Sequence, residues 1–362
     1  MKRAVLKLAA RLPKPKEDWR DFWRALVGTF VVVSVFLYGA IVLIDPFDSI
    51  FFSLPVERAP VTTNQRFAFP ALARKARFDS AIFGTSMTRL LKPASLNPKL
   101  GARFVNLSMN SATAWEQQQV FTLFARHHRE PKVVIFGIDG TWCELIEHKK
   151  LTFRPFPPWL YDENPWNDLL HIYNPKTLEQ AGLQLAFITG MEPARRGRDG
   201  YTNFLPPRSE YDLGRIRLGI YRSRTPKPIV AKAPPVPIDP TWRFPSHAML
   251  AEMLGRLPPR TVKVMLLVPY HVYVQPHPGT RRDAQYRLCK ARLAELGRGR
   301  ANFHLLDFMI PSALTREDGN YWDPLHFDLK SAERIAVGIR HGVTRRAGIP
   351  DLFDYIPAAG SN

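Results

Sequence analysis

The most regular pattern of apolar positions lies near the start of the chain. Residues 25–44, ALVGTFVVVSVFLYGAIVLI, contain no charged side chain. A helix of this length rises about 30 Å, the thickness of the hydrocarbon layer of a bilayer. A cleaved signal peptide is the competing interpretation, but its apolar core is usually only ~7–15 residues long, and no small-x-small site follows this run. The pattern therefore predicts an uncleaved transmembrane helix.

Charge before this helix predicts its orientation. Residues 1–24 carry eight Lys or Arg and three Asp or Glu side chains. Basic segments stay on the cytoplasmic side of a membrane span. We therefore expect residues 1–24 to form a cytoplasmic basic segment of a single-pass protein in a bacterial inner membrane, with the main domain in the periplasm.

Downstream, short apolar runs alternate with amphipathic patterns. The runs are 79–84, 103–108, 132–139, 262–270 and 302–308. Each has apolar residues at both odd and even positions, as in parallel strands that are covered on both faces. Helical patterns follow or lie between them, at 112–128, 247–257, 283–299 and 329–346. This alternation predicts a doubly wound, three-layer α/β/α fold with a parallel five-stranded sheet.

The rhythm of the pattern sets the expected domain boundaries. Residues 45–77 are punctuated by proline and predict an extended linker, the α/β domain covers 78–346, and a tail follows at 347–362. Residues 140–246, rich in Pro, Trp, Tyr and Arg with one helical pattern near 175–188, interrupt the domain as an insertion. This insertion could cover the active edge as a lid, or be a surface elaboration without a chemical role.

Composition narrows the class of partner. The formal net charge is +19, which favours an anionic polymer or anionic lipid headgroups, although a generally solvated basic surface explains it equally well. No zinc-finger, RNP or basic-zipper pattern is present, and an exported domain meets little DNA, so no nucleic-acid partner is expected.

The two cysteines, Cys143 and Cys289, are too few for a disulfide framework. Cys143 follows a predicted core strand and Cys289 lies in a predicted helix. We therefore expect buried free thiols, with a single bridge in an oxidising compartment as the alternative.

Ser86 ends the stretch FDSAIFGTS, directly after an apolar run and a Gly-Thr turn. At the turn from a strand into a helix, a serine hydroxyl can cap the helix. It can also act as a nucleophile at the ligand-binding edge, where free N–H groups of the helix favour a developing negative charge. This stretch alone does not separate the two roles.

The motif WDPLHFD at 322–328 favours the nucleophile. Asp323 and His326 stand three residues apart, so a turn can place the carboxylate against one imidazole nitrogen while the other faces outward. Such a carboxylate orients the ring and stabilises the imidazolium that forms when histidine takes a proton from serine. The pair comes just before the last predicted helix.

With these motifs the sequence resembles the SGNH (GDSL-like) hydrolases, within them the membrane-anchored branch of DltD-like and AlgJ/AlgX-like O-acyltransferases. The first block of that family matches GTS with Ser86 as nucleophile, the second matches NLSMNSAT at 106–113, the third corresponds to GID at 137–139, and the last is Asp323 to His326. The resemblance implies a flavodoxin-like sheet and acyl chemistry on envelope polymers.

Three positions depart from the family pattern. Thr85 replaces the aspartate of the first block, Ser111 the glycine of the second, and Asp139 the asparagine of the third. An ionised carboxylate cannot donate a hydrogen bond, so Asp139 is a poor donor to an oxyanion. The expected donors are the Ser86 N–H and the side-chain amide of Asn110, beside Ser111.

One further histidine is placed at the same edge. His271 follows the fourth predicted strand and is expected to contact substrate, as is Asp139. A metal pair of His271 with His277 lacks a carboxylate or cysteine at ligand spacing, so we expect neither a metal nor another cofactor.

The sequence thus predicts a membrane-anchored periplasmic serine acyltransferase or esterase that acts on O-acyl, chiefly acetyl, groups of a cell-envelope polysaccharide. A multi-spanning membrane acyltransferase is the expected partner for transfer, because acetyl-CoA stays in the cytoplasm. The alternative is a non-catalytic SGNH-fold protein that binds a glycan or scaffolds a polysaccharide complex.

Overall fold

The computed structural model describes residues 18–147, 149–194 and 196–360, and its body is built around one six-stranded sheet. The strand order is β2-β1-β3-β4-β5-β6. The strands are β1 (Ser80–Phe83), β2 (Phe104–Asn106), β3 (Val133–Ile138), β4 (Val262–Leu267), β5 (Phe303–Asp307) and β6 (Asp354–Ile356). The first five run parallel, and β6 runs antiparallel to β5.

All five predicted strands are present, and the sixth corrects the expected number. Strand β6 lies within the predicted tail. It has only three residues, Asp-Tyr-Ile, and none of them is fully buried. Such a short, half-exposed edge strand leaves no apolar run for the sequence pattern to register.

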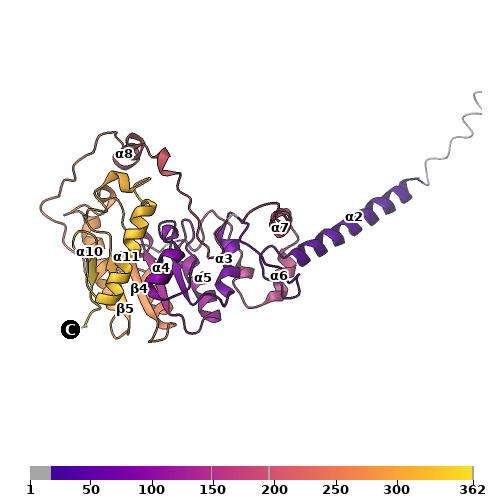
Figure 1. The fold of residues 1–362 in the computed structure, drawn as a ribbon, viewed down its shortest axis with the longest axis horizontal. Helices are drawn as coiled ribbons and strands as arrows, with labels where there is room; N and C mark the ends of the chain where they lie inside the picture. The colour runs from indigo at the N-terminus through magenta and orange to yellow at the C-terminus, as the bar shows by residue number, and fades with distance from the viewer. Residues whose placement is uncertain (1–17, 148, 195, 361–362) are drawn as a thin grey trace, which may run out of the picture.

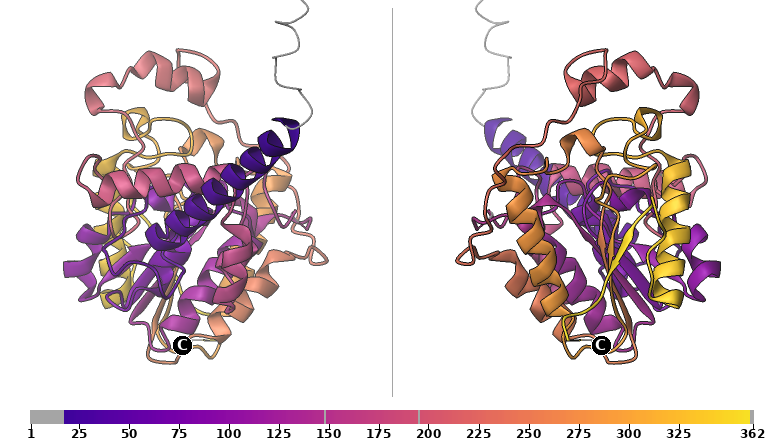
Figure 2. Two further views of the ribbon diagram at one scale, coloured as in Figure 1. Left: turned by 90° about the vertical axis from the view of Figure 1, so that its right-hand side faces the viewer. Right: turned by 90° about the vertical axis from the view of Figure 1, so that its left-hand side faces the viewer.

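Helices cover both faces of the sheet, which makes the fold a layered α/β structure. Figure 2 shows α10 (Arg281–Leu296) and α11 (Leu329–Arg345) on opposite sides of the strands. Helix α4 (Pro93–Leu100) packs on α11, whereas α3 (Gln65–Arg74) packs on α5 (Ala114–His127), which in turn packs on α9 (Ser246–Gly255). The helices at 114–127, 246–255, 281–296 and 329–345 confirm the four amphipathic patterns.

Helix α3 corrects the expected linker at 45–77. Pro70 inside this segment argues against a helix, because proline removes a backbone donor. Two features override it: the side chain of Asn64 caps the helix by accepting from the Arg66 N–H, and the buried face of α3 packs on α5. The linker is therefore part of the folded body.

Helix α2 (Asp18–Ile44) projects away from the body (Figure 1). Its stretch Trp19–Ile44 is long and apolar enough to cross a membrane, a property that a signal sequence near an N-terminus shares. The end nearest the body packs against α7 (Pro175–Ile188) and lies next to α6 (Pro165–His171). Most of the basic segment predicted at 1–24, namely residues 1–17, lies outside the described residues.

The insertion at 140–246 divides into two parts. Its first part holds α6 and α7 beside the C-terminal end of α2, which we call its base. Helix α7 has the bounds that the sequence pattern predicts. Its second part holds α8 (Leu213–Tyr221), which lies at the opposite side of the body in Figure 1. The two parts of one insertion therefore reach different regions of the molecule.

The cysteines correct the expectation of free thiols. Cys143 and Cys289 form a disulfide, with their Cα atoms 5.5 Å apart. Cys143 ends the short helical turn Gly140–Cys143, which packs on α10, where Cys289 lies. The sequence places the two residues on separate elements, and only the packing of these elements shows that they meet.

Candidate active site

The candidate site lies at the carboxyl edge of the parallel strands. Ser86 follows β1, Ser111 follows β2 and Asp139 follows β3. In a doubly wound sheet, ligands bind outside this edge, at the point where successive connections leave in opposite directions. Here that point lies between β1 and β3. An open hollow at this edge is lined by Ser86, Ser111, Asp139, Tyr270 and Leu325, among others.

The turn after β1 fixes Ser86. Gly84 has a φ of +152°, and a Cβ there would stand 2.3 Å from Thr88 Oγ1, so only glycine allows Thr88 to fold back over the strand end. A single 3₁₀ turn, Thr88–Leu90, follows instead of the expected helix. Its cap position is Met87, without a side-chain hydrogen bond, so Ser86 is not the cap.

The hydroxyl of Ser86 points to the imidazole of His326. Ser86 Oγ lies 2.8 Å from His326 Nε2, and His326 Nδ1 lies 2.6 Å from Asp323 Oδ2. An ionised carboxylate only accepts hydrogen bonds, so the ring proton sits on Nδ1 and Nε2 accepts from the serine hydroxyl. The structure thus brings together, in the arrangement of a catalytic triad, the three residues that the sequence singles out.

A tight turn holds Asp323 and His326. Asp323 Oδ1 accepts from the backbone N–H groups of Leu325 and His326 at 2.8 and 2.9 Å, and the Trp322 N–H donates to the His326 carbonyl. Burial acts to raise the pKa of Asp323, but the hydrogen bond and charge of His326 and the two backbone N–H groups outweigh it and hold the pKa below its usual value. The carboxylate therefore stays ionised beside the imidazole.

The loop after β2 is held by two arginines that the sequence analysis did not single out. Arg66 and Glu116 form a fully buried ion pair with N–O distances of 2.6 and 2.5 Å, and Arg66 Nη1 also donates to the Asn110 carbonyl. Arg89 donates to the side-chain oxygen of Asn110. Asn110 is therefore fixed from both its backbone and its side chain, and Ser111 follows it with a φ of +51°.

This geometry makes Ser111 a better donor to an oxyanion than Asn110. Ser111 lines the hollow with Ser86, whereas Asn110 is not among its lining residues. Within the described part of the chain, the backbone N–H groups of Ser86 and Ser111 donate no hydrogen bond. Two free N–H groups at one hollow match the donor set of an oxyanion hole.

Thr85 and Asp139, which follow neighbouring strands, contact each other. Thr85 Oγ1 donates to Asp139 Oδ2 at 2.7 Å, and the Thr141 N–H donates to Asp139 Oδ1 at 3.0 Å. Asp139 thus lines the hollow as an acceptor of hydrogen bonds. Its carboxylate steadies the turn that carries Ser86.

His271 does not reach the hollow, which corrects the expectation that it contacts substrate. Its side chain is fully buried, with Nε2 3.1 Å from Asp318 Oδ1, while Nδ1 accepts from the Tyr273 N–H. Burial lowers the pKa of His271 and Asp318 opposes this effect. Asp318 also accepts from Tyr221 of α8, so this cluster joins the insertion to the loop just before Asp323.

The second part of the insertion contacts the triad itself. The Phe204 ring meets the His326 ring edge to face, with centroids 5.4 Å apart, and the Arg89 guanidinium lies 4.7 Å from the Phe204 centroid. Further along, Tyr211 packs on Trp322, which adjoins Asp323. Phe204 lies outside every motif in the sequence, so only the fold reveals that it borders the site.

Within the ranges that the structure describes, no three His, Cys, Asp or Glu side chains gather closely enough to hold a metal ion. Comparisons with known proteins add no further constraint: no protein-family model matches this sequence, and no curated protein is significantly similar to it.

Proposed function

We propose that this protein is a membrane-anchored, SGNH-like serine acyltransferase or esterase that acts on O-acyl, chiefly acetyl, groups of a cell-envelope polysaccharide. The observation that carries the proposal is the pair of contacts from Ser86 Oγ to His326 Nε2 at 2.8 Å and from His326 Nδ1 to Asp323 Oδ2 at 2.6 Å. The serine and the histidine are 240 positions apart in sequence, so local structure alone does not explain their contact.

The reaction follows from this geometry. Ser86 Oγ attacks the acyl carbonyl while His326 Nε2 takes the hydroxyl proton, and Asp323 stabilises the imidazolium. The negative charge on the carbonyl oxygen is met by the backbone N–H groups of Ser86 and Ser111. As the intermediate collapses, His326 returns the proton to the leaving oxygen, and an acyl-Ser86 ester remains. A sugar hydroxyl or water then repeats the steps in reverse.

Placement of the motifs supports the family assignment. The parallel strands follow the order 2-1-3-4-5, which is the flavodoxin-like order. The three blocks that resemble the family lie at the carboxyl ends of β1, β2 and β3, and the Asp-His pair comes before α11. The contact between Thr85 and Asp139 also accounts for two of the departures at once, because a hydroxyl donor and a carboxylate acceptor have replaced the family's acidic and amide residues as a pair.

The non-catalytic alternative, a glycan-binding or scaffolding protein, predicts a serine and histidine that have lost contact, or a hollow filled by side chains. Here the two groups lie within hydrogen-bond distance and the hollow is open. The geometry therefore favours turnover over binding alone.

Location and partner belong to the same proposal. The disulfide between Cys143 and Cys289 fits an oxidising compartment such as the periplasm. The buried end of α2 fits an anchor that is not removed, because cleavage after α2 would take away Ile41 and Val42 and expose Ile172 and Ala181, on which they pack. A multi-spanning membrane acyltransferase would supply the acyl group from the cytoplasmic side.

The test is covalent labelling of the full-length protein in detergent with a fluorophosphonate probe. We expect rapid labelling of the wild type, none of Ser86→Ala, and a rate at least about 10³-fold lower for His326→Ala. Ser209→Ala, outside the triad, is the matched control and should label like the wild type. A folded wild-type protein that does not react would refute the proposed serine chemistry.

A further inference from the structure

Large apolar side chains face outward around the base of α2. Leu170 is 83% exposed, Phe51 66% and Trp166 61%. We call the group the collar; its members are Phe51, Phe52, Trp166, Leu170, Tyr173 and Leu185. An exposed apolar surface of this kind marks a site of contact with a membrane or another protein.

The collar is an ordered structure. The Phe51 ring packs edge to face on Trp166 and on Phe52, with centroid distances of 5.2 and 5.0 Å. Tyr173 packs on Tyr38 of α2 at 5.9 Å, and the Tyr38 hydroxyl donates to the Leu169 carbonyl. The collar is therefore fixed directly to the apolar helix.

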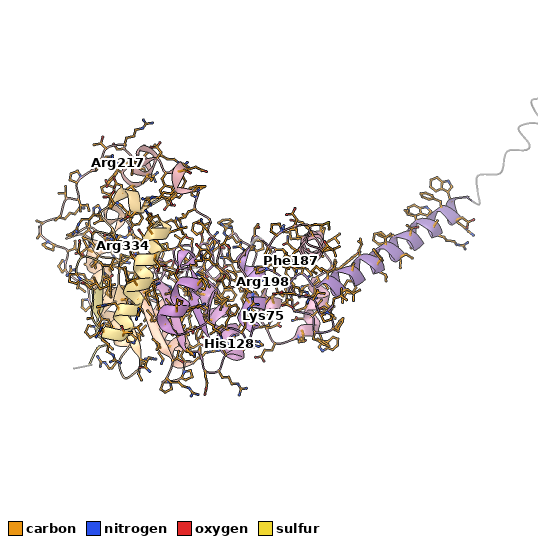
Figure 3. The ribbon with its side chains drawn as sticks, in the orientation of Figure 1. Lys75, His128, Phe187, Arg198, Arg217 and Arg334 are labelled. Atoms are coloured by element: carbon orange, nitrogen blue, oxygen red, sulfur yellow. A yellow bond between two sulfur atoms is a disulfide. The ribbon has the colours of Figure 1, made fainter. Side chains whose placement is uncertain are left out.

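One face of the last two turns of α2 packs into this structure, while Leu43 remains 48% exposed. Ile41 and Val42 are 1% and 8% exposed, and they pack with Ile172, which follows α6, and Ala181 of α7. Along the preceding stretch the side chains stand out from α2, with no other segment of the described residues beside them (Figure 3). The helix thus has a free part and a part enclosed by the collar.

The free part is too short to cross a bilayer. The charged residue Arg24 precedes it, and enclosure begins at Tyr38. The stretch 25–37 rises only about 20 Å as a helix, whereas the hydrocarbon layer is about 30 Å thick. The missing length, about 10 Å, matches the enclosed turns at 38–44. A span by α2 therefore brings the collar down to the level of the lipids.

From this geometry we propose that the collar is embedded in the interfacial layer of the bilayer, so that α6, α7 and Phe51–Phe52 contact lipid directly. This inference rests on the membrane anchoring in the proposed function. Trp and Tyr are the side chains that favour the boundary between headgroups and acyl chains, and Leu and Phe favour the adjoining hydrocarbon. The first part of the insertion is then a lipid-contacting element.

The test measures the depth of single labels in the full-length protein. Leu170→Cys carries an NBD fluorophore, in vesicles of phosphatidylethanolamine and phosphatidylglycerol with doxyl-labelled lipids as quenchers. Phe36→Cys reports on the free part of α2. Val230→Cys, on the second part of the insertion and 72% exposed, is the control in water. Each introduced residue replaces an exposed side chain, so the fold and the native disulfide are preserved.

We expect the Leu170 label to be quenched at least about three-fold more than the Val230 label, most strongly by shallow quenchers, and the Phe36 label to be quenched most strongly by deep ones. Equal quenching at Leu170 and Val230, with Phe36 quenched, would overturn the collar proposal and leave the anchor intact. No quenching at Phe36 would refute the anchor and the collar together. A Leu170 label that is unquenched in vesicles but protected from an aqueous quencher in native membranes would assign the collar to a protein partner and overturn lipid contact.

Discussion

At the carboxyl edge of the sheet, polar side chains are paired with one another, whereas at the base of α2 apolar side chains pack on each other and still leave much of their surface exposed. Ser86, His326 and Asp323 satisfy each other before any substrate arrives. Leu170 and Trp166 are 83% and 61% exposed. The first region is complete as folded, while the second becomes complete only in contact with something else.

One insertion serves both regions, and this explains why it has no single pattern. Its first part encloses α2, and its second part brings Phe204 to His326 and α8 to Asp318. A substitution in one part should therefore leave the other region unchanged.

The largest effect is expected at the triad. Asp323→Asn keeps the size of the side chain but removes the charge that orients and stabilises the imidazolium, so the rate of p-nitrophenyl acetate hydrolysis should fall about 10³–10⁴-fold. Asp351→Asn, on the surface and paired with Arg316, is the control and should stay within about two-fold of the wild type. The depth of the NBD label at Leu170→Cys in the vesicle membrane should be the same in both variants. A normal rate in Asp323→Asn would exclude the proposed role of the carboxylate.

The disulfide should give the next largest effect, on stability. Cys143→Ala with Cys289→Ala releases a cross-link that spans 146 positions, and the free energy of unfolding should fall by roughly 3–5 kcal/mol. Urea denaturation of the reduced wild type should match the double variant. Cys143 follows Asp139 closely in the sequence, so the carboxyl edge should be weakened more than the collar. In the double variant, we expect fluorophosphonate reactivity to be lost at a lower urea concentration than the quenching of the Leu170 label. Simultaneous loss would show that the two regions unfold as one unit.

Phe204→Ala should reduce turnover about 3–10-fold, because the ring that packs on His326 is lost while the triad remains. Leu185→Ala in the first part of the insertion removes a side chain of the collar and should leave turnover unchanged. Steady-state rates of the two variants compare the two parts directly. Equal losses would mean that the collar also affects catalysis.

A pH dependence of stability should arise in the sheet, outside both regions. Burial, together with the charge of Arg346, lowers the pKa of His304 to about 4, below the unfolded value of about 6.5. Between these values the unfolded chain binds more protons, so stability present at pH 7 is lost as the pH falls towards 4. Over this pH interval, the free energy of unfolding of His304→Phe should fall by roughly 1–2 kcal/mol less than that of the wild type, as measured by thermal or urea unfolding. Parallel curves would disprove this contribution.

The smallest effect is expected at Ser111. Its φ of +51° is unfavourable for a side chain, so Ser111→Gly should stabilise the protein by about 0.5 kcal/mol while keeping the backbone N–H proposed to bind the oxyanion. Turnover should stay within about three-fold. A loss of activity beyond about ten-fold would indicate that the Ser111 hydroxyl, and not its N–H, acts in the reaction.

Much of the body could be predicted from the sequence because its signals are local. The five parallel strands are continuous apolar runs, and the motif around Asp323 and His326 carries its own turn. Ser86 was separable from a helix cap only through these other residues. In the strands and in the turn of Asp323 and His326, residues near each other in sequence determine the geometry.

What the sequence did not reveal depends on contacts between distant segments. Arg66 lies in the segment predicted to be a linker, but it donates to the Asn110 carbonyl and so holds the loop of Ser111. Nothing in the sequence around Arg66 indicates that role. The disulfide, the burial of His271 and the approach of Phe204 to His326 likewise require the packing of elements that no pattern joins. Strand β6 is too short for a pattern of its own.

For an α2 that spans a membrane, the enclosure of Tyr38 and Ile41 has a mechanical consequence. Because α2 is packed into the body, the body tilts together with the helix. A spanning α2 therefore prevents the domain from rotating relative to its anchor. Ser86 would then stay at a constant distance from the lipid surface, while the whole protein diffuses laterally and rotates about the membrane normal. A polymer would have to pass through that thin layer to be modified, and only the segments within it would be reached.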